Sequence, residues 1–213
     1  MLRARSQRGV SMIEIAIVLA IIGIGMSWAM PSYSKWMQNA QIRNMAEMII
    51  GGVQQARSEA ISRSGNVEFL LTSLNPTSAD KQALIPALAD ANGVNWMIRA
   101  ANLPGAPTPY TYVAGSVGTE GSSKATVQAG DINISGNLNA VTFDGFGRVV
   151  AANADASLPI TKICVASSAL TAANGAKVLE IDVSAGGQVK MCDPSVTAGT
   201  DPRRCLTAAP RCA

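Results

Sequence analysis

The feature that most constrains this chain is an apolar run close to its N-terminus. Residues 10–30 read VSMIEIAIVLAIIGIGMSWAM and contain a single charged side chain, Glu14. As an α-helix, a run of this length extends about 30 Å, which matches the thickness of the hydrocarbon core of a bilayer. The apolar part of an ordinary secretory signal is shorter and is followed by a small-residue cleavage site. The run therefore predicts a transmembrane helix.

The basic residues around this run indicate its orientation. Arg3, Arg5 and Arg8 all lie on its N-terminal side. The positive-inside rule therefore places residues 1–9 in the cytoplasm and exports the rest. Removing these three arginines from the 17 basic residues leaves 14, equal to the 14 acidic residues. The exported part is about neutral, so the formal charge of +3 predicts no general attraction to nucleic acid.

Glu14 is the one residue of the run that membrane insertion does not explain. An unpaired carboxylate inside an apolar helix costs several kcal/mol, so such a residue is functional by default. A solvated glutamate near the membrane interface is the plainer interpretation. A functional role requires a cationic partner. Cleavage between Gly9 and Val10 would create one, the new α-amino group of a neighbouring subunit.

These residues resemble the class III leader of type IV pilins. The run Arg8-Gly9-Val10 is followed by Glu14 and by an apolar helix containing Pro31. The resemblance implies that a prepilin peptidase cuts after Gly9 on the cytoplasmic face and N-methylates Val10. Glu14 is then the fifth mature residue, and Pro31 corresponds to the helix-kinking proline of the family. Val10 stands where phenylalanine is usual, a difference that the peptidase generally tolerates.

Beyond Pro31 the apolar pattern continues with helical spacing. The apolar positions are Trp36, Ala40, Ile42, Met45, Ile49, Val53, Ala56 and Ala60. With polar residues between them, they predict an amphipathic helix that continues the anchor, and we interpret them as core packing that holds a head to the helix. Gly51 and Gly52 weaken this helix, by about 1 kcal/mol each relative to alanine. A glycine stop signal predicts its end at residues 64–66.

The remainder predicts short strands separated by turn residues. The expected strands are residues 67–72, 96–100, 110–113, 126–134, 140–143, 147–151, 160–166, 177–183 and 188–192. The predicted fold class is α+β: a long N-terminal helix, half transmembrane and half amphipathic, packed on an antiparallel β head. The predicted division is a leader (1–9), a transmembrane helix (10–30), an amphipathic helix (31–64) and a periplasmic β-rich head with a cysteine-containing tail (65–213).

Three further segments narrow the resemblance to the GspH/FimT group of minor pilins and pseudopilins. QARSEAI (55–61) is similar to the end of that group's helix, VTFDGFGR (141–148) to its F-x-G-x-G-R hairpin, and GQVKMCDP (187–194) to its closing strand. The resemblance implies a FimT-like minor type IV pilin that assembles into or primes the pilus, with DNA contact during uptake. The alternative is a GspH-like minor pseudopilin of a type II secretion system.

The resemblance also implies partners and a location. The expected partners are other pilin or pseudopilin subunits in a helical filament, the prepilin peptidase, an inner-membrane assembly platform and duplex DNA. The protein is expected in the inner membrane as a single-pass chain with a cytoplasmic N-terminus and a periplasmic head, and then in the pilus or pseudopilus.

DNA contact would depend on basic residues of the closing strand and the tail. The candidates are Lys190, Arg203, Arg204 and Arg211. DNA-binding members carry a Gly-Arg-x-Arg motif where residues 187–190 of this chain read GQVK, so one arginine is absent and the other is a lysine. Lysine neutralises a phosphate but lacks the planar fork of arginine. In the plainer interpretation the arginines are solvated or pair with Asp193 and Asp201.

All four cysteines lie in the last quarter of the chain, at Cys164, Cys192, Cys205 and Cys212. An even number in an exported domain favours disulfides, and the absence of a CxxC pair makes a zinc site the weaker interpretation. Two pairings are equally simple. One joins 192 to 205 and 164 to 212, and the other joins 164 to 192 and 205 to 212.

The sequence also argues against an enzyme. It contains no histidine, which excludes the catalytic triad, histidine proton shuttles and most catalytic zinc sites. Its aspartates are scattered over predicted turns and strands, and its glycine-rich stretch at 115–121 lacks a P-loop lysine. We predict a protein without catalytic residues, cofactor or metal. A single-pass protein whose head binds a partner without filament assembly is a further hypothesis, in which Glu14 would be unnecessary.

Overall fold

One long helix precedes eight strands in the computed structural model, which describes residues 9–76, 89–102, 106, 109–118, 125–130, 140–169, 175 and 177–205. The chain divides into two compact units, Met1–Met37 and Gln38–Ala213, and helix α1 (Met12–Arg63) passes through both. The strands are β1 (Val67–Thr72), β2 (Asn95–Ala101), β3 (Tyr110–Ser116), β4 (Ala125–Gly130), β5 (Ala140–Phe143), β6 (Lys162–Ser167), β7 (Leu179–Val183) and β8 (Val189–Cys192). This confirms the predicted α+β fold class.

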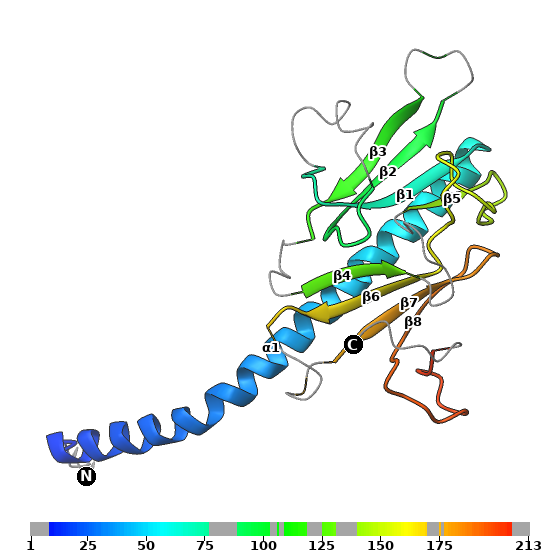
Figure 1. The fold of residues 1–213 in the computed structure, drawn as a ribbon. Helices are drawn as coiled ribbons and strands as arrows, with labels where there is room; N and C mark the ends of the chain where they lie inside the picture. Colours follow the sequence, from blue (N-terminus) through cyan, green and yellow to red (C-terminus); the bar gives the residue numbers. More distant parts are fainter. Residues whose placement is uncertain are drawn as a thin grey trace, which may run out of the picture. The chain divides into compact units, whose positions relative to one another are not determined.

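The strands form two separate antiparallel sheets, each with four strands (Figure 1). The order in the first sheet is β3-β2-β1-β5, and the order in the second is β4-β6-β7-β8. Strand β1 is an inner strand, with Val67 opposite both Ala100 of β2 and Phe143 of β5. All six residues of β1 are buried, so its side chains are covered on both faces of the sheet.

The core of the Gln38–Ala213 unit lies between the second part of α1 and both sheets. Helix residues spaced three or four apart are completely buried: Ile42, Met45, Ala46, Ile49, Val53, Ala56 and Ala60. They pack with Phe69 and Phe143 of the first sheet and with Ile163 of the second. The predicted stripe is therefore confirmed from Ile42 onward. Trp36, in the other unit, is 63% exposed, so its assignment to the stripe is wrong.

The helix ends at Arg63, next to the predicted stop signal. The Ser64 N–H donates to the Ile61 carbonyl (3.2 Å) and the Gly65 N–H donates to the Ala60 carbonyl (3.1 Å), the two bonds of a Schellman motif. The residue with positive φ is Ser64 (49°), one position before the glycine. At the C-terminus of this helix, the left-handed conformation is therefore adopted by Ser64 rather than by Gly65.

One predicted strand is wrong. Residues 147–151 form only an isolated bridge, between Val149 and Phe143. Gly147 has a φ of 74°, and the Asp144 carboxylate accepts hydrogen bonds from the N–H groups of Phe146 and Arg148 (2.9 Å each). These bonds close a turn, and the Val149 N–H then donates to the Ala185 carbonyl (3.0 Å), which lies outside the strands, so the segment does not continue a ladder. Of the strand predicted at 126–134, residues 131–134 lie outside the described residues.

Gly52 allows the close approach of α1 to the first sheet. A Cβ atom on Gly52 would lie 2.9 Å from Phe69 Cε2 and 3.0 Å from two ring atoms of Trp96. A Cβ atom on the adjacent Gly51 would meet nothing within 4 Å. The sequence predicts the same helix-weakening effect for both glycines, but in the structure only Gly52 is needed for close packing.

We predict opposite effects for alanine at these two positions. Gly51→Ala should raise the free energy of unfolding by about 1 kcal/mol, because alanine favours the helix. Gly52→Ala should lower it, because the overpacking cost of about 1–3 kcal/mol exceeds that gain. Chemical unfolding of the full chain in detergent micelles measures both variants. A Gly52→Ala protein as stable as the Gly51→Ala protein would contradict the close approach.

Candidate functional site: the N-terminal helix, the paired turns and the tail

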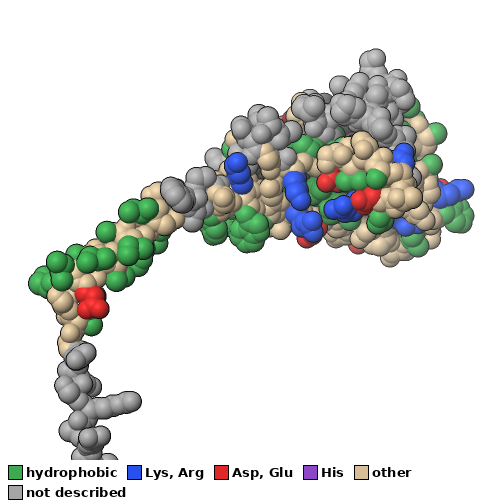
Figure 2. Space-filling view, turned by 90° about the horizontal axis from the view of Figure 1, so that it is seen from below, with side chains coloured by type: hydrophobic (Ala, Val, Ile, Leu, Met, Phe, Trp, Pro, Cys, Tyr) green, Lys and Arg blue, Asp and Glu red, His purple; other side chains and the backbone are tan. Residues whose placement is uncertain are grey.

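The N-terminal part of α1 exposes a long apolar surface. Large side chains that are 46% exposed or more occupy positions Val10, Met12, Ile13, Ile15, Ile17, Val18, Leu19, Ile21, Ile22, Ile24, Met26 and Met30. Figure 2 shows hydrophobic side chains along this segment with an acidic side chain among them, and Glu14 is the one acidic residue of positions 10–30. An apolar surface of this extent marks a site of contact with lipid or protein.

For a possible membrane span, two stretches of this helix have to be considered together. In the described residues, no single helix is both long and apolar enough to cross a membrane. The bent pair Met12–Ser27 and Ser32–Arg63 meets that test by length and composition. Pro31 lies between these two stretches, inside α1.

The predicted cleavage site immediately precedes the helix. Gly9, Val10 and Ser11 are non-helical, and Gly9 and Val10 are both exposed. The Ser11 carbonyl accepts the N–H groups of Glu14 (3.1 Å) and Ile15 (3.2 Å), which starts the helix at Met12. The Gly9–Val10 peptide bond therefore lies in non-helical, accessible backbone.

Arg57 joins α1 to one turn from each sheet, a role that the sequence analysis did not assign to it. Its Nε donates to the Gly147 carbonyl (2.9 Å), and its Nη2 donates to the Gly186 carbonyl (3.4 Å). The Gly147 carbonyl belongs to the turn after β5, and that of Gly186 to the turn between β7 and β8. The two segments that carried the family resemblance, 141–148 and 187–194, thus meet at the helix segment 55–61. The signal that could have revealed this contact is the presence of Arg57 within one of the segments that resemble the family, 55–61.

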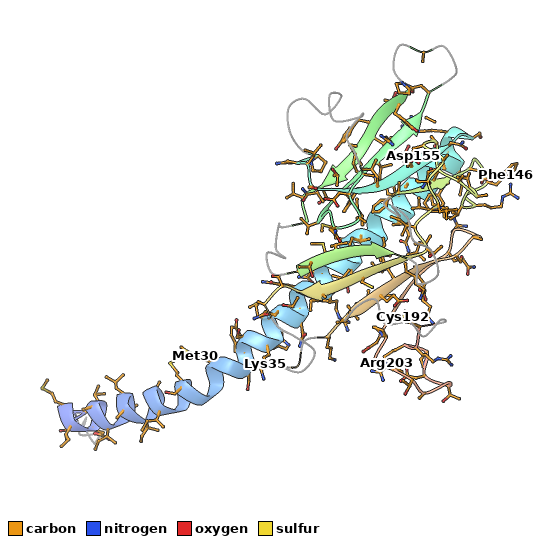
Figure 3. The ribbon with its side chains drawn as sticks, in the orientation of Figure 1. Met30, Lys35, Phe146, Asp155, Cys192 and Arg203 are labelled. Carbon is orange, nitrogen blue, oxygen red and sulfur yellow. A yellow bond between two sulfur atoms is a disulfide. The ribbon has the colours of Figure 1, made fainter. Side chains whose placement is uncertain are left out.

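The paired turns require glycine. Gly147 and Gly187 have φ angles of 74° and 76°, which side-chain-bearing residues rarely adopt. A Cβ atom on Gly187 would lie 2.1 Å from the Gly147 carbonyl oxygen and 2.9 Å from Arg57 Nε. The turns are therefore in direct contact. Next to them, Phe146 projects into solvent with 81% of its surface exposed (Figure 3).

The tail folds back on β8 through a disulfide. Cys192, at the end of β8, is bonded to Cys205 (S–S 2.05 Å), and the Asp193 N–H donates to the Arg203 carbonyl (2.7 Å). In the chain-entropy model, closing a loop of this size stabilises the fold by about 3 kcal/mol. Of the two pairings left open, the structure contains the 192–205 bridge. Cys164 is also disulfide-bonded, and its predicted partner, Cys212, lies outside the described residues.

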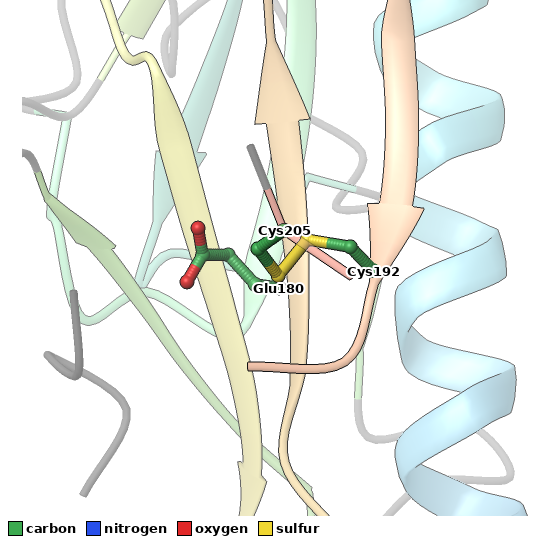
Figure 4. Close-up of side chains that lie close together, drawn as sticks. All are labelled: Glu180, Cys192 and Cys205. Atoms are coloured by element: carbon green, nitrogen blue, oxygen red, sulfur yellow. A yellow bond between two sulfur atoms is a disulfide. The ribbon is translucent and has the colours of Figure 1, made fainter. Parts of the chain in front are cut away.

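Three potential metal ligands lie close together at this bridge, and two of them are its own sulfurs (Figure 4). The carboxylate of Glu180 and the sulfurs of Cys192 and Cys205 lie within 4.8 Å of one another. Both sulfurs are joined in the disulfide, whereas metals bind the thiolate form. Burial raises the pKa of Glu180, and Lys162, which forms an ion pair with it, offsets part of that effect. This cluster therefore serves as packing and ion pairing.

The structure brings together three of the four DNA-contact candidates. The Lys190 ammonium donates to the Arg204 carbonyl (3.3 Å), and the Arg203 guanidinium makes two hydrogen bonds to the Asp201 carboxylate (3.1 and 2.8 Å). Hydrogen bonds from Arg203 lower the pKa of Asp201 to about 2. Arg203 thus pairs with an aspartate, as in the plainer interpretation. Arg211 lies outside the described residues.

The fold and the N-terminal motif define a pilin-like α+β protein. Residues 4–30 match the prokaryotic N-terminal methylation motif. Residues 45–187, more than half of the chain, match the family described as Type II transport protein GspH, and the chain belongs to this family. The resemblance to minor pilins and pseudopilins is thereby confirmed. Such proteins are structural subunits rather than enzymes, and they associate with other pilin subunits in a filament.

Three solved structures are similar to this chain. Two are crystal forms of the type IV minor pilin FimU of Pseudomonas aeruginosa strain PAO1. They are 17% and 19% identical, cover 73% and 70% of this chain and 91% and 90% of FimU, and have TM-scores of 0.44 and 0.40. The third is the minor pseudopilin EpsH from the Type 2 Secretion System of Vibrio cholerae, at 7% identity, 73% and 99% coverage and a TM-score of 0.45. No curated protein matches the chain.

We predict that Arg57→Ala lowers the free energy of unfolding by about 1.5–3 kcal/mol, the usual value of hydrogen bonds to a charged group. The matched control is Arg63→Ala, six positions further along the same helix. Arg63 is exposed and pairs with Glu59 (2.8 Å), so its loss should cost less than about 1 kcal/mol. Thermal unfolding of the full chain compares the two variants. Equal effects would mean that Arg57 does not stabilise the paired turns.

Proposed function

We propose that this chain is a FimT-like minor pilin that assembles into or primes a type IV pilus. The observation that carries the proposal is the exposed apolar surface of the N-terminal helix, with Glu14 inside it and the accessible Gly9–Val10 bond before it. A filament core formed from such helices would bury this surface and remove its cost in water. The head would then occupy the outside of the filament.

Glu14 has the electrostatic role in this proposal. After cleavage by the prepilin peptidase, the α-amino group of Val10 on a neighbouring subunit would pair with the Glu14 carboxylate. In a low-dielectric helical core such a pair is strong, and a single unpaired charge is costly. Pro31 would allow the helix to bend where the apolar segment meets the head. Before assembly, the chain would lie in the inner membrane with a cytoplasmic N-terminus and a periplasmic head, in contact with the assembly platform.

A GspH-like minor pseudopilin of a type II secretion system is the second candidate. It is favoured by the description of the matching family, Type II transport protein GspH. Both functions use the same leader, the same helix and the same carboxylate. They differ in the filament that the subunit enters.

Contact with duplex DNA is a further part of the pilus proposal, carried by Lys190, Arg203, Arg204 and Arg211. Pairing of Arg203 with Asp201 reduces the positive charge available for phosphates. Among the described residues of β8 and the tail, the candidates number three, against the two aspartates Asp193 and Asp201. Any such binding would therefore be weak and non-specific.

We predict that Glu14→Ala leaves membrane insertion intact and removes the subunit from filaments. The matched control is Glu47→Ala, which changes an exposed glutamate of the same helix within the head unit. Immunoblots of the membrane fraction and of sheared pili from the native bacterium measure both properties. Recovery of the Glu14→Ala subunit in sheared pili at the level of the Glu47→Ala control would contradict the assembly role.

The same preparation separates the two candidate functions. A pilus subunit should appear in sheared pili, and its deletion should leave secretion through the type II system unchanged. If the wild-type chain is absent from the pili and its deletion blocks that secretion, the pseudopilin function is correct.

We predict that the mature chain begins at N-methylated Val10. Cleavage after Gly9 removes residues 1–9, and the methyl group adds to the new amine. Intact-mass measurement on protein purified from the membrane fraction detects both changes, with cells lacking the prepilin peptidase as the control. A chain that still carries residues 1–9 in cells with an active peptidase would contradict the prediction.

A further inference from the structure

A cavity of about 290 Å³ lies over the face of the first sheet that is turned away from the helix core. Its polar lining consists of Asn66, Glu68, Tyr110 and Thr142, and its apolar lining consists of Ala101, Val150, Ala152 and Ala154. The volume is near the lower limit of small-molecule sites. It therefore fits one side chain or a small amine better than a nucleotide.

Glu68 supplies the charge of this cavity. Only 3% of the residue is exposed, although it belongs to the lining. Arg99 Nε donates to Glu68 Oε2, and the Arg99 guanidinium lies over the Tyr110 ring, 4.0 Å from the ring centroid. Arg99 is not among the lining residues, so the cavity presents the acid rather than its basic partner.

The second oxygen of Glu68 has only a distant partner. Its Oε1 lies 3.5 Å from the Thr142 hydroxyl, which is only 2.9 Å from Asn153 Oδ1. The Asn153 amide orientation is defined by its Nδ2, which donates to the Ala140 carbonyl (3.0 Å) and the Leu158 carbonyl (3.2 Å). A hydroxyl has one proton, and the nearer acceptor receives it. Within the described part of the chain, the donor to Glu68 Oε1 is therefore a long and shared one.

The local charge balance favours a cation. Among the described residues, two charged groups shift the pKa of Glu68: the guanidinium of Arg99 and the carboxylate of Asp155, which is labelled in Figure 3. Together with Glu68 they give two negative charges and one positive charge. Burial raises the pKa of the Glu68 carboxyl, and Arg99 offsets only part of this effect. A carboxylate or phosphate ligand would be repelled here, whereas a second cation would stabilise the ionised glutamate.

We propose that this cavity binds an alkyl cation, an ammonium or guanidinium group on a methylene stem, which donates to Glu68 Oε1. The alanine and valine walls would cover the stem, and the carboxylate would receive the charged end. The cation has two potential sources, a lysine or arginine side chain of a partner protein and a free diamine. The proposal is independent of the choice between pilus and secretion system.

The test uses the full chain in detergent micelles, with the alanine methyl groups labelled for NMR. Titration with Nα-acetyl-lysine methylamide should give saturable shifts at Ala101, Ala152 and Ala154. The neutral analogue Nα-acetyl-norleucine methylamide and the anionic Nα-acetyl-glutamate methylamide should give none. Equal shifts with the neutral or the anionic probe, or no shift with the lysine probe, would overturn the proposal.

Two variants locate the binding. Glu68→Gln should weaken the affinity for the lysine probe by about tenfold or more, the loss expected for a charge-assisted hydrogen bond. Ala152→Leu fills the exposed side of the cavity and should abolish binding even if Glu68→Gln does not fold. The matched control, Ala151→Leu, changes an exposed neighbour outside the lining and should bind as the wild type does. Undiminished binding by the Ala152→Leu protein would place the cation elsewhere.

A parallel titration with 1,4-diaminobutane distinguishes the two sources. Tighter binding of the capped lysine supports a side chain of a partner as the natural occupant. Tighter binding of the diamine supports a free polyamine. Both outcomes support an alkyl-cation site.

Discussion

Both sheets of the head are packed against one face of a single helix, and the rest of the head depends on this packing. The eight described strands form no ladder between the two sheets, so hydrogen bonds between these strands do not join them. Their apolar faces converge on the stripe from Ile42 to Ala60, which contributes side chains to one continuous core. Burial of each of its larger side chains, Ile42, Met45, Ile49 and Val53, stabilises a fold by about 1.5–3 kcal/mol, so the stripe is the main source of cohesion between the sheets. Because Gly52 has no side chain, the rings of Phe69 and Trp96 can pack against the helix backbone.

Polar contacts at the end of the helix complete this arrangement. Arg57 donates to a carbonyl from each sheet, and the turns that carry those carbonyls touch through Gly147 and Gly187. Gly147 is buried, and a buried carbonyl without a donor costs free energy, which Arg57 avoids. Gly186 is exposed, so the longer bond of Arg57 to its carbonyl contributes less. The disulfide between Cys192 and Cys205 then holds the tail against β8. The head is thus fixed at its core, its turns and its tail by three kinds of interaction.

The N-terminal part of α1 differs from the head, because it exposes its apolar side chains instead of burying them. Its apolar side chains are exposed, and the described residues of its own unit do not cover them. Within a membrane or a filament the same side chains become favourable, because lipid or neighbouring helices replace water. A subunit of this kind is complete only in its assembly, which is consistent with the family to which the chain belongs.

The sequence alone determined the elements whose signals are local. The apolar run with Glu14, the helical stripe from Ile42 onward and the strands at 67–72 and 140–143 were all predictable, because periodicity and turn residues act over a few positions. The strand at 147–151 was predicted wrongly, because its N–H groups have acceptors in different places: that of Arg148 donates to the Asp144 side chain, and that of Val149 to the Ala185 carbonyl.

Only the tertiary structure decided which residues from distant segments meet. The contact of Gly52 with Trp96, the bonds of Arg57 to two turns and the pairing of Glu68 with Arg99 all join residues far apart in the chain. No local pattern encodes them, because each contact depends on how the sheets are positioned on the helix. The sequence also left two disulfide pairings open, and the pairing seen follows from the return of the tail to the end of β8, which brings the Cα atoms of Cys192 and Cys205 to 5.0 Å.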